Sequence, residues 1–158
     1  MRNYSFLLAC LFLFACKGKQ IKQDATEAQQ AADFSDSDTI IVWNCDAEKE
    51  TRSRIFQSDD SIQNILPLIN GINSTYPEMQ LRFDAVSKDT VLVEVIEGKL
   101  LVNQMGSSGA EQYLSFAAMN LLEAKGIRFV KFSLPEGAHA KTSVWNTSDF
   151  TDWKIIAE

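Results

Sequence analysis

The sequence lacks a long apolar run. Its N-terminal run, residues 4–15, is too short for a stable transmembrane helix, which takes roughly 20 apolar residues. It follows a single positive charge at Arg2, ends in the small residue Ala15, and turns polar directly after position 16. These features argue against a transmembrane anchor in this stretch and are typical of a secretory signal peptide.

Residues 13–16 (Leu-Phe-Ala-Cys) resemble the lipobox, the cleavage and acylation site of bacterial lipoproteins. Phe14 departs from the small or aliphatic residue usual at its place. The resemblance implies cleavage before Cys16 and acyl chains such as palmitate on that thiol. Residues 7–10 (Leu-Leu-Ala-Cys) fit the pattern too, but they would leave too short an apolar core. An ordinary signal peptide with an incidental cysteine is the alternative.

Few cysteines are left for other roles. Of the three in the sequence, Cys10 leaves with the leader and Cys16 carries lipid in this interpretation, so Cys45 has no partner for an intrachain disulfide. Cys45 follows the apolar run 40–43, where a lone cysteine is more often a small buried hydrophobe than a reactive thiol. We therefore expect an exported domain that is stable without a disulfide bond.

Basic residues are outnumbered by acidic ones. Lys and Arg number 15 against 21 Asp and Glu, so the formal net charge is −6. Among charged residues, cleavage before Cys16 removes Arg2 alone. An acidic chain is disfavoured as a partner of nucleic acid or of anionic lipid head groups. Acyl chains on Cys16, rather than a basic patch, would then hold the protein at a membrane.

The chain divides into three parts. Residues 1–15 are the predicted signal peptide. Residues 16–38 are rich in Gln, Ala, Asp, Lys and Ser, and they cannot bury enough apolar surface to offset the entropy of ordering. Residues 39–158 are long enough to form a hydrophobic core of their own. The sequence thus predicts a flexible tether over 16–38 and a single folded domain over 39–158.

The domain opens with a predicted strand and helix. An apolar run over 39–45 predicts a buried strand. Asp59 and Asp60 are suited to cap a helix, and the apolar residues over 62–72 fall on one helical face. Pro67 lies inside this pattern and indicates either a kink or a later start of the helix.

A β-hairpin is predicted next. Polar and apolar residues alternate over 80–85, and a β-branched run over 90–96 follows a turn at 87–89. Residues 100–104 are interpreted as another short strand at an edge.

The clearest local pattern is that of the second helix. Ser108 and Glu111 have the spacing of a capping box, an apolar stripe runs over 110–124, and Gly126 is suited to end the helix in a left-handed conformation. A strand over 127–134 follows. The order strand, helix, strand, strand, helix, strand predicts an α+β fold, a two-layer α/β arrangement of a small mixed sheet with both helices on one face. A tail with aromatic residues completes the chain.

A family resemblance extends over residues 89–153. It rests on the strand at 90–96, the loop 105–111 that opens a helix, and the strand at 127–134 that ends in Pro-Glu-Gly. This layout resembles the GerMN-type domain, which is named for sporulation and spore germination proteins and occurs in extracytoplasmic bacterial lipoproteins. The resemblance implies a small α/β binding or assembly module of the envelope and brings no catalytic residues with it. The tail after Gly137 has no counterpart in it.

The first candidate binding site is the loop of Gly106, Ser107, Ser108 and Gly109. Free amides at a helix start carry partial positive charge and can hold an anion. The lysine of a phosphate-binding P-loop is missing, however, and no Arg or Lys lies over 105–124. A capping role without a ligand is the simpler interpretation. A weakly held carboxylate or sugar group is the alternative.

His139, the only histidine, is the second candidate. A hydrolase would combine it with Ser107 or Ser108 as the nucleophile and Asp149 as the orienting carboxylate. The serines do not stand in a Gly-x-Ser-x-Gly nucleophile elbow, so a turn or surface histidine is the competing interpretation. With one histidine, no free cysteine pair and no acidic loop of calcium spacing in the domain, we expect neither a metal nor a cofactor.

Phe116 and Met119 are the third candidate. On a helical wheel they project away from the apolar stripe, beside Gln112 and Glu123, where solvent is expected. Large apolar groups there need a cover, either from aromatics of the C-terminal tail or from a partner protein. The aromatics concerned are Trp145, Phe150 and Trp153.

Three functional hypotheses follow. The first is a non-enzymatic, extracytoplasmic lipoprotein of the bacterial envelope, tethered to a membrane through Cys16, whose domain binds a protein or cell-wall component. The second is a small hydrolase using His139, and the third is a structural spacer without a specific ligand. The predicted binding residues are Gly106, Ser107, Ser108, Gly109, Phe116, Met119 and His139.

Overall fold

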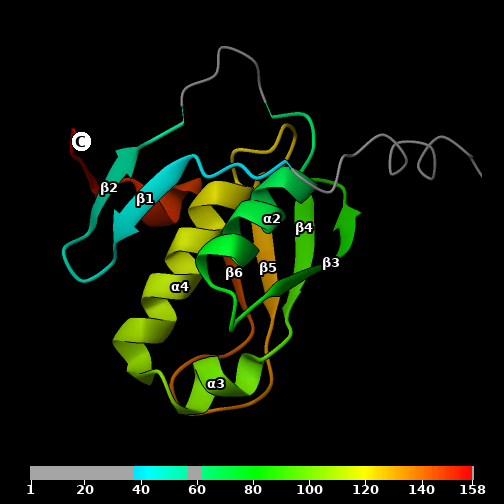
Figure 1. The fold of residues 1–158 in the computed structure, drawn as a ribbon, viewed down its shortest axis with the longest axis vertical. Helices are drawn as coiled ribbons and strands as arrows, with labels where there is room; N and C mark the ends of the chain where they lie inside the picture. Colours follow the sequence, from blue (N-terminus) through cyan, green and yellow to red (C-terminus); the bar gives the residue numbers. More distant parts are fainter. Residues whose placement is uncertain (1–37, 57–61, 158) are drawn as a thin grey trace, which may run out of the picture. The chain divides into compact units, whose positions relative to one another are not determined.

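The computed structural model describes residues 38–56 and 62–157, which belong to one compact unit over 35–158 (Figure 1). The predicted signal peptide, the tether up to residue 37 and the expected helix caps Asp59 and Asp60 lie outside the described residues. Helices and strands are mixed along the described chain, which confirms the predicted α+β class. None of the helices in these ranges is long and apolar enough to cross a membrane.

The larger of two sheets has the strand order β3-β4-β5-β6. β3 (Leu81–Ser87) and β4 (Thr90–Val95) form the predicted antiparallel hairpin. β4 runs parallel to β5 (Phe129–Ser133), and β5 runs antiparallel to β6 (Ser143–Asn146). Alternate residues of β4 and β5 are buried, which shows that one face of this sheet is covered. These residues are Val91, Val93, Val95, Val130 and Phe132.

Helices α2 (Leu66–Thr75) and α4 (Gly106–Leu121) lie on the same face of this sheet (Figure 1), as predicted. α2 begins at Leu66 and has Pro67 in its first turn, where the missing N–H would have no partner within the helix. Of the two interpretations of Pro67, the later start is therefore correct. α2 contacts both β3 and α4.

The start of α4 differs from the prediction. The helix begins at Gly106, which has φ of 73°, and its N-cap residue Met105 makes no side-chain cap hydrogen bond. The expected capping box of Ser108 and Glu111 is wrong, because the chain turns into the helix three residues earlier and Ser108 lies inside the first turn. At the other end, Gly126 does take a left-handed conformation, with φ of 81°, in the turn before β5.

Residues 98–103 form the short helix α3 (Gly98–Asn103), so the predicted edge strand over 100–104 is wrong. Leu101 and Val102 are both buried, although they are neighbours in sequence. A half-buried strand would bury alternate residues instead. The two residues lie on one side of a helical turn, and α3 packs against α4.

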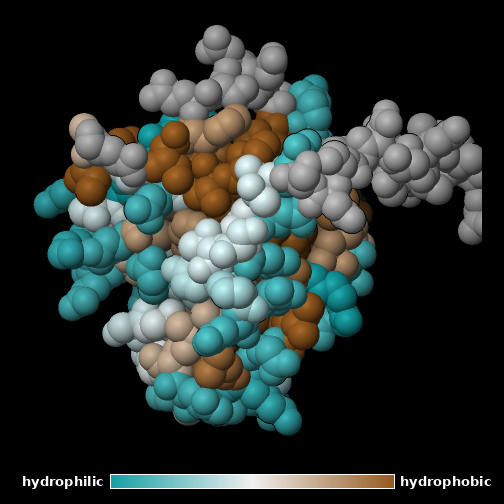
Figure 2. Space-filling model, viewed as in Figure 1, coloured by the Kyte–Doolittle hydropathy of each residue, from teal (hydrophilic) through white to brown (hydrophobic). Residues whose placement is uncertain are grey.

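The smaller sheet has the order β1-β2-β7, whereas one sheet was expected. β1 (Trp43–Asp46) pairs antiparallel with β2 (Thr51–Arg54), and β2 pairs parallel with β7 (Lys154–Ile155). β2 was not predicted, because its sequence Thr-Arg-Ser-Arg has no apolar residue. Figure 2 shows apolar surface over the region of β1 and β2. The exposed apolar residues of the small sheet and its ends are Ile55, Ile155 and Ile156.

The C-terminal tail is part of the fold. After β6 it forms the 3-10 helix η1 (Thr147–Phe150) and then β7. Asn146 caps η1 by accepting the N–H of Ser148, and Asp149 completes a capping box. Trp145 stacks on Phe150 with ring centroids 5.6 Å apart, and Trp153 meets Phe150 edge-on. Phe150 belongs to the main hydrophobic core.

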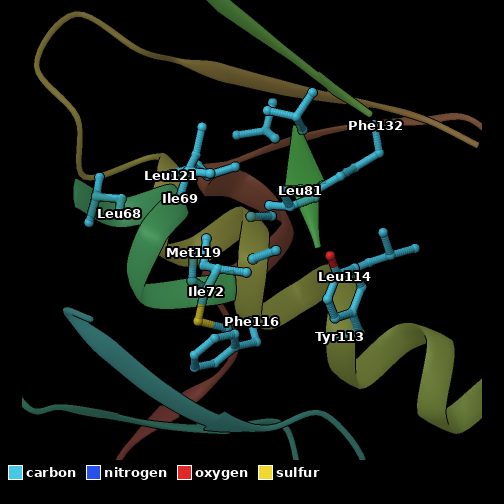
Figure 3. Close-up of a cluster of buried hydrophobic side chains, with 14 of the residues drawn as sticks. Leu68, Ile69, Ile72, Leu81, Tyr113, Leu114, Phe116, Met119, Leu121 and Phe132 are labelled. Atoms are coloured by element: carbon cyan, nitrogen blue, oxygen red, sulfur yellow. The ribbon is translucent and has the colours of Figure 1, made fainter. Parts of the chain in front are cut away.

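Phe116 and Met119 lie inside the core, each with only 3% of its surface exposed. Both side chains are thus covered within the domain, and their role as a partner patch is wrong. The ring of Tyr76 meets the ring of Phe116 at 5.4 Å, and Figure 3 shows Phe116 and Met119 within the buried cluster near Ile72 of α2. β1 also packs against α4. A helical wheel assumes one buried face, whereas α4 is covered on more than one side.

Candidate functional site

A hollow lies at the carboxyl ends of the parallel strands β4 and β5. Its volume is about 530 Å³, and it is lined by residues 94–99 on one side and 133–135 on the other; we call it the strand-end hollow. Parallel strands end at the same edge of a sheet, and ligands of open α/β sheets bind outside that edge. Here the chain leaves β4 into α3 and leaves β5 into a loop, so both walls turn away from the sheet.

The strand-end hollow has a mixed lining. Its polar side chains are those of Glu94, Glu97, Lys99 and Ser133. Glu94 forms an ion pair with Arg82 of β3, whereas Glu97 and Lys99 form no ion pair with any other residue of the described ranges. Ile96 is 50% exposed and adds an apolar side chain. Such a lining is suited to a polar ligand that is held by charges and hydrogen bonds with one apolar contact.

The loop after β5 is held tightly against α3. A Cβ atom on Gly98 would lie 2.6 Å from Cδ of Pro135, and one on Gly137 would lie 2.3 Å from Cβ of Val102. The backbone N–H of His139 donates to the carbonyl of Val102 at 2.9 Å. Because only glycine permits these two close approaches, the loop packs directly against α3 and the two together form a wall beside the hollow.

Two of the predicted site residues do come together. Oγ of Ser107, exposed in the first turn of α4, lies 3.4 Å from Nδ1 of half-buried His139. Asp149, the proposed third member, instead accepts the N–H of Asn146 at 2.7 Å. In the ranges that the structure describes, no carboxylate hydrogen-bonds to the His139 ring. The geometry thus provides a Ser–His pair without the group that would orient its imidazole.

The other predicted residues do not complete a site. Ser108 is exposed and Gly109 half-buried in the first turn of α4, and Phe116 and Met119 lie in the core. Residues of the strand-end hollow were not predicted. Gly98 and Pro135 mark the ends of two apolar runs in the sequence, and from them the ends of the two strands could have been predicted. The parallel pairing that brings these ends together has no sequence signature of its own.

Cys45 lies on β1, away from the strand ends. The side-chain amide of Gln112 lies 3.7 Å from its Sγ atom. Burial raises the pKa of the Cys45 thiol from 9.0 to about 11, although the Gln112 hydrogen bond acts in the opposite direction. A thiol that stays protonated is a poor nucleophile and a poor metal ligand. Across 38–56 and 62–157, no three His, Cys, Asp or Glu side chains gather at metal-binding distances.

No protein-family model, curated protein or solved structure matches this chain.

Proposed function

We propose that the chain is a lipid-anchored protein of the bacterial envelope, and that its α+β domain is a non-enzymatic binding module. The strand-end hollow would hold a polar segment of a cell-wall component or of another envelope protein. The observation that carries the proposal is the mixed lining of this hollow, with unpaired Glu97 and Lys99 beside exposed Ile96. These groups are suited to recognition, because they present charge and apolar surface together on a fixed frame.

The location is supported by the sequence. The short apolar leader, the lipobox-like residues 13–16 and the polar tether form the layout of a lipoprotein. The resemblance of residues 89–153 to the GerMN-type domain points in the same direction, since that domain occurs in extracytoplasmic lipoproteins. Together these features favour a tethered module that meets its ligand outside the cytoplasm.

The lipid anchor is tested by metabolic labelling with palmitate in a bacterial host. We expect the label on the full-length chain to be lost in Cys16→Ser and retained in Cys10→Ser, because cleavage before Cys16 removes Cys10 and leaves Cys16 as the acylated residue. Label that persists in Cys16→Ser would show that the anchor was assigned to the wrong cysteine.

Binding is tested by crosslinking in cells. A photo-crosslinking amino acid replaces Ile96 at the strand-end hollow, and a matched variant carries it at Val86, which is similarly exposed at 47% but lies near the other end of β3. We expect a reproducible crosslinked species from position 96 and a much weaker one from position 86. Equal yields, or no species at either position, would contradict a binding role for the hollow and favour the spacer hypothesis.

A second candidate function is hydrolysis, which is favoured by the 3.4 Å approach of Ser107 to His139. His139 would act as the base, and the free amides in the first turn of α4 would face the oxyanion. His139→Ala separates the two functions: hydrolysis of a chromogenic ester would disappear, whereas crosslinking from position 96 would remain.

A further inference from the structure

We draw no further inference here: the strongest candidate, the exposed apolar surface patch of Ile55, Ile155 and Ile156 at the small sheet and its ends, carries nothing because no feature of the described residues shows what covers it.

Discussion

The side-chain amide of Asn120 pairs with the backbone of Trp43 as a neighbouring strand would. Its Oδ1 accepts the N–H of Trp43 at 3.0 Å, and its Nδ2 donates to the carbonyl of Trp43 at 3.0 Å. Oδ1 also accepts the N–H of Val42 at 2.7 Å. Asn120 is fully buried in α4, so water cannot replace these bonds. The side-chain amide of Asn120 therefore holds β1, and with it the small sheet, against α4.

Asn120→Leu should be strongly destabilising, because leucine has a similar volume but leaves three backbone groups of Val42 and Trp43 without partners. At about 1–3 kcal/mol for each buried unsatisfied group, we expect the free energy of unfolding to fall by about 3 kcal/mol or more. Urea denaturation of residues 39–158 measures it. Asn103→Leu, at an exposed position of α3, is the control and should change stability by less than about 1 kcal/mol. Equal effects of the two substitutions would contradict the role of Asn120.

Phe116→Ala tests whether this side chain belongs to the core or to a docking surface. Its ring packs against Tyr76 inside the core, so removal should lower the free energy of unfolding by about 3–5 kcal/mol. Phe83→Ala is the matched control, since Phe83 on the edge strand β3 is 38% exposed and should lose about 1 kcal/mol. A stable Phe116→Ala chain that loses only its partner would restore the docking interpretation.

Gly137→Ala should displace the loop after β5. The new Cβ atom would lie 2.3 Å from two carbons of Val102, so the loop must move and the hydrogen bond from His139 to Val102 must lengthen. We expect a loss of about 1–3 kcal/mol from this overpacking, together with faster hydrogen exchange of the His139 amide. Gly126→Ala is the comparison, because its cost of about 1 kcal/mol comes from positive φ without a clash and should leave the His139 amide protected. Unchanged exchange at His139 in Gly137→Ala would refute the close contact.

Cys45 should make the domain less stable at high pH. Burial raises its pKa in the folded state to about 11 from the ordinary value of 9.0, so the folded state binds the thiol proton more tightly. Its contribution is fully present below pH 9 and is lost as the pH rises toward 11. Burial raises the pKa of Tyr76 and Tyr113 as well, and they act in the same direction. The difference in unfolding free energy between the parent and Cys45→Ala isolates the thiol; a difference that is constant from pH 8 to 11 would show that its pKa is unshifted.

The fold class and the local elements with strong periodicity could be predicted from sequence. The hairpin of β3 and β4 and the strand β5 have alternating or β-branched residues, and each forms where expected. α2 and α4 also occur, because a stripe of apolar residues at helical spacing specifies a packed helix whatever its neighbours are. Their exact starts depend on the preceding segment, and here the predicted caps were not the residues used.

The rest depends on contacts between distant parts of the chain. β2 is a strand because it pairs with β1 on one side and with β7 on the other, although it has no apolar residue. Gln112 of α4 and Glu123, which follows the end of this helix, were expected on a solvent face, but both bond to β1. Gln112 donates to the Cys45 carbonyl, and Glu123 accepts from the Trp43 indole. Polar residues that serve as partners for a backbone are indistinguishable in sequence from polar residues that face water.

The way β1 is attached bears on how the domain would carry mechanical load. Ile40, just before β1, donates its N–H to Pro67 of α2, and Asn120 and Gln112 of α4 hold the strand farther along, while β2 pairs with its other side. Under the proposed anchorage through Cys16, a pull from the membrane enters the domain at this segment. A pull directed along β1 would load these bonds together in shear, whereas a pull across the strand would break them one at a time. Hydrogen bonds that are loaded together resist a larger force than the same bonds broken in sequence.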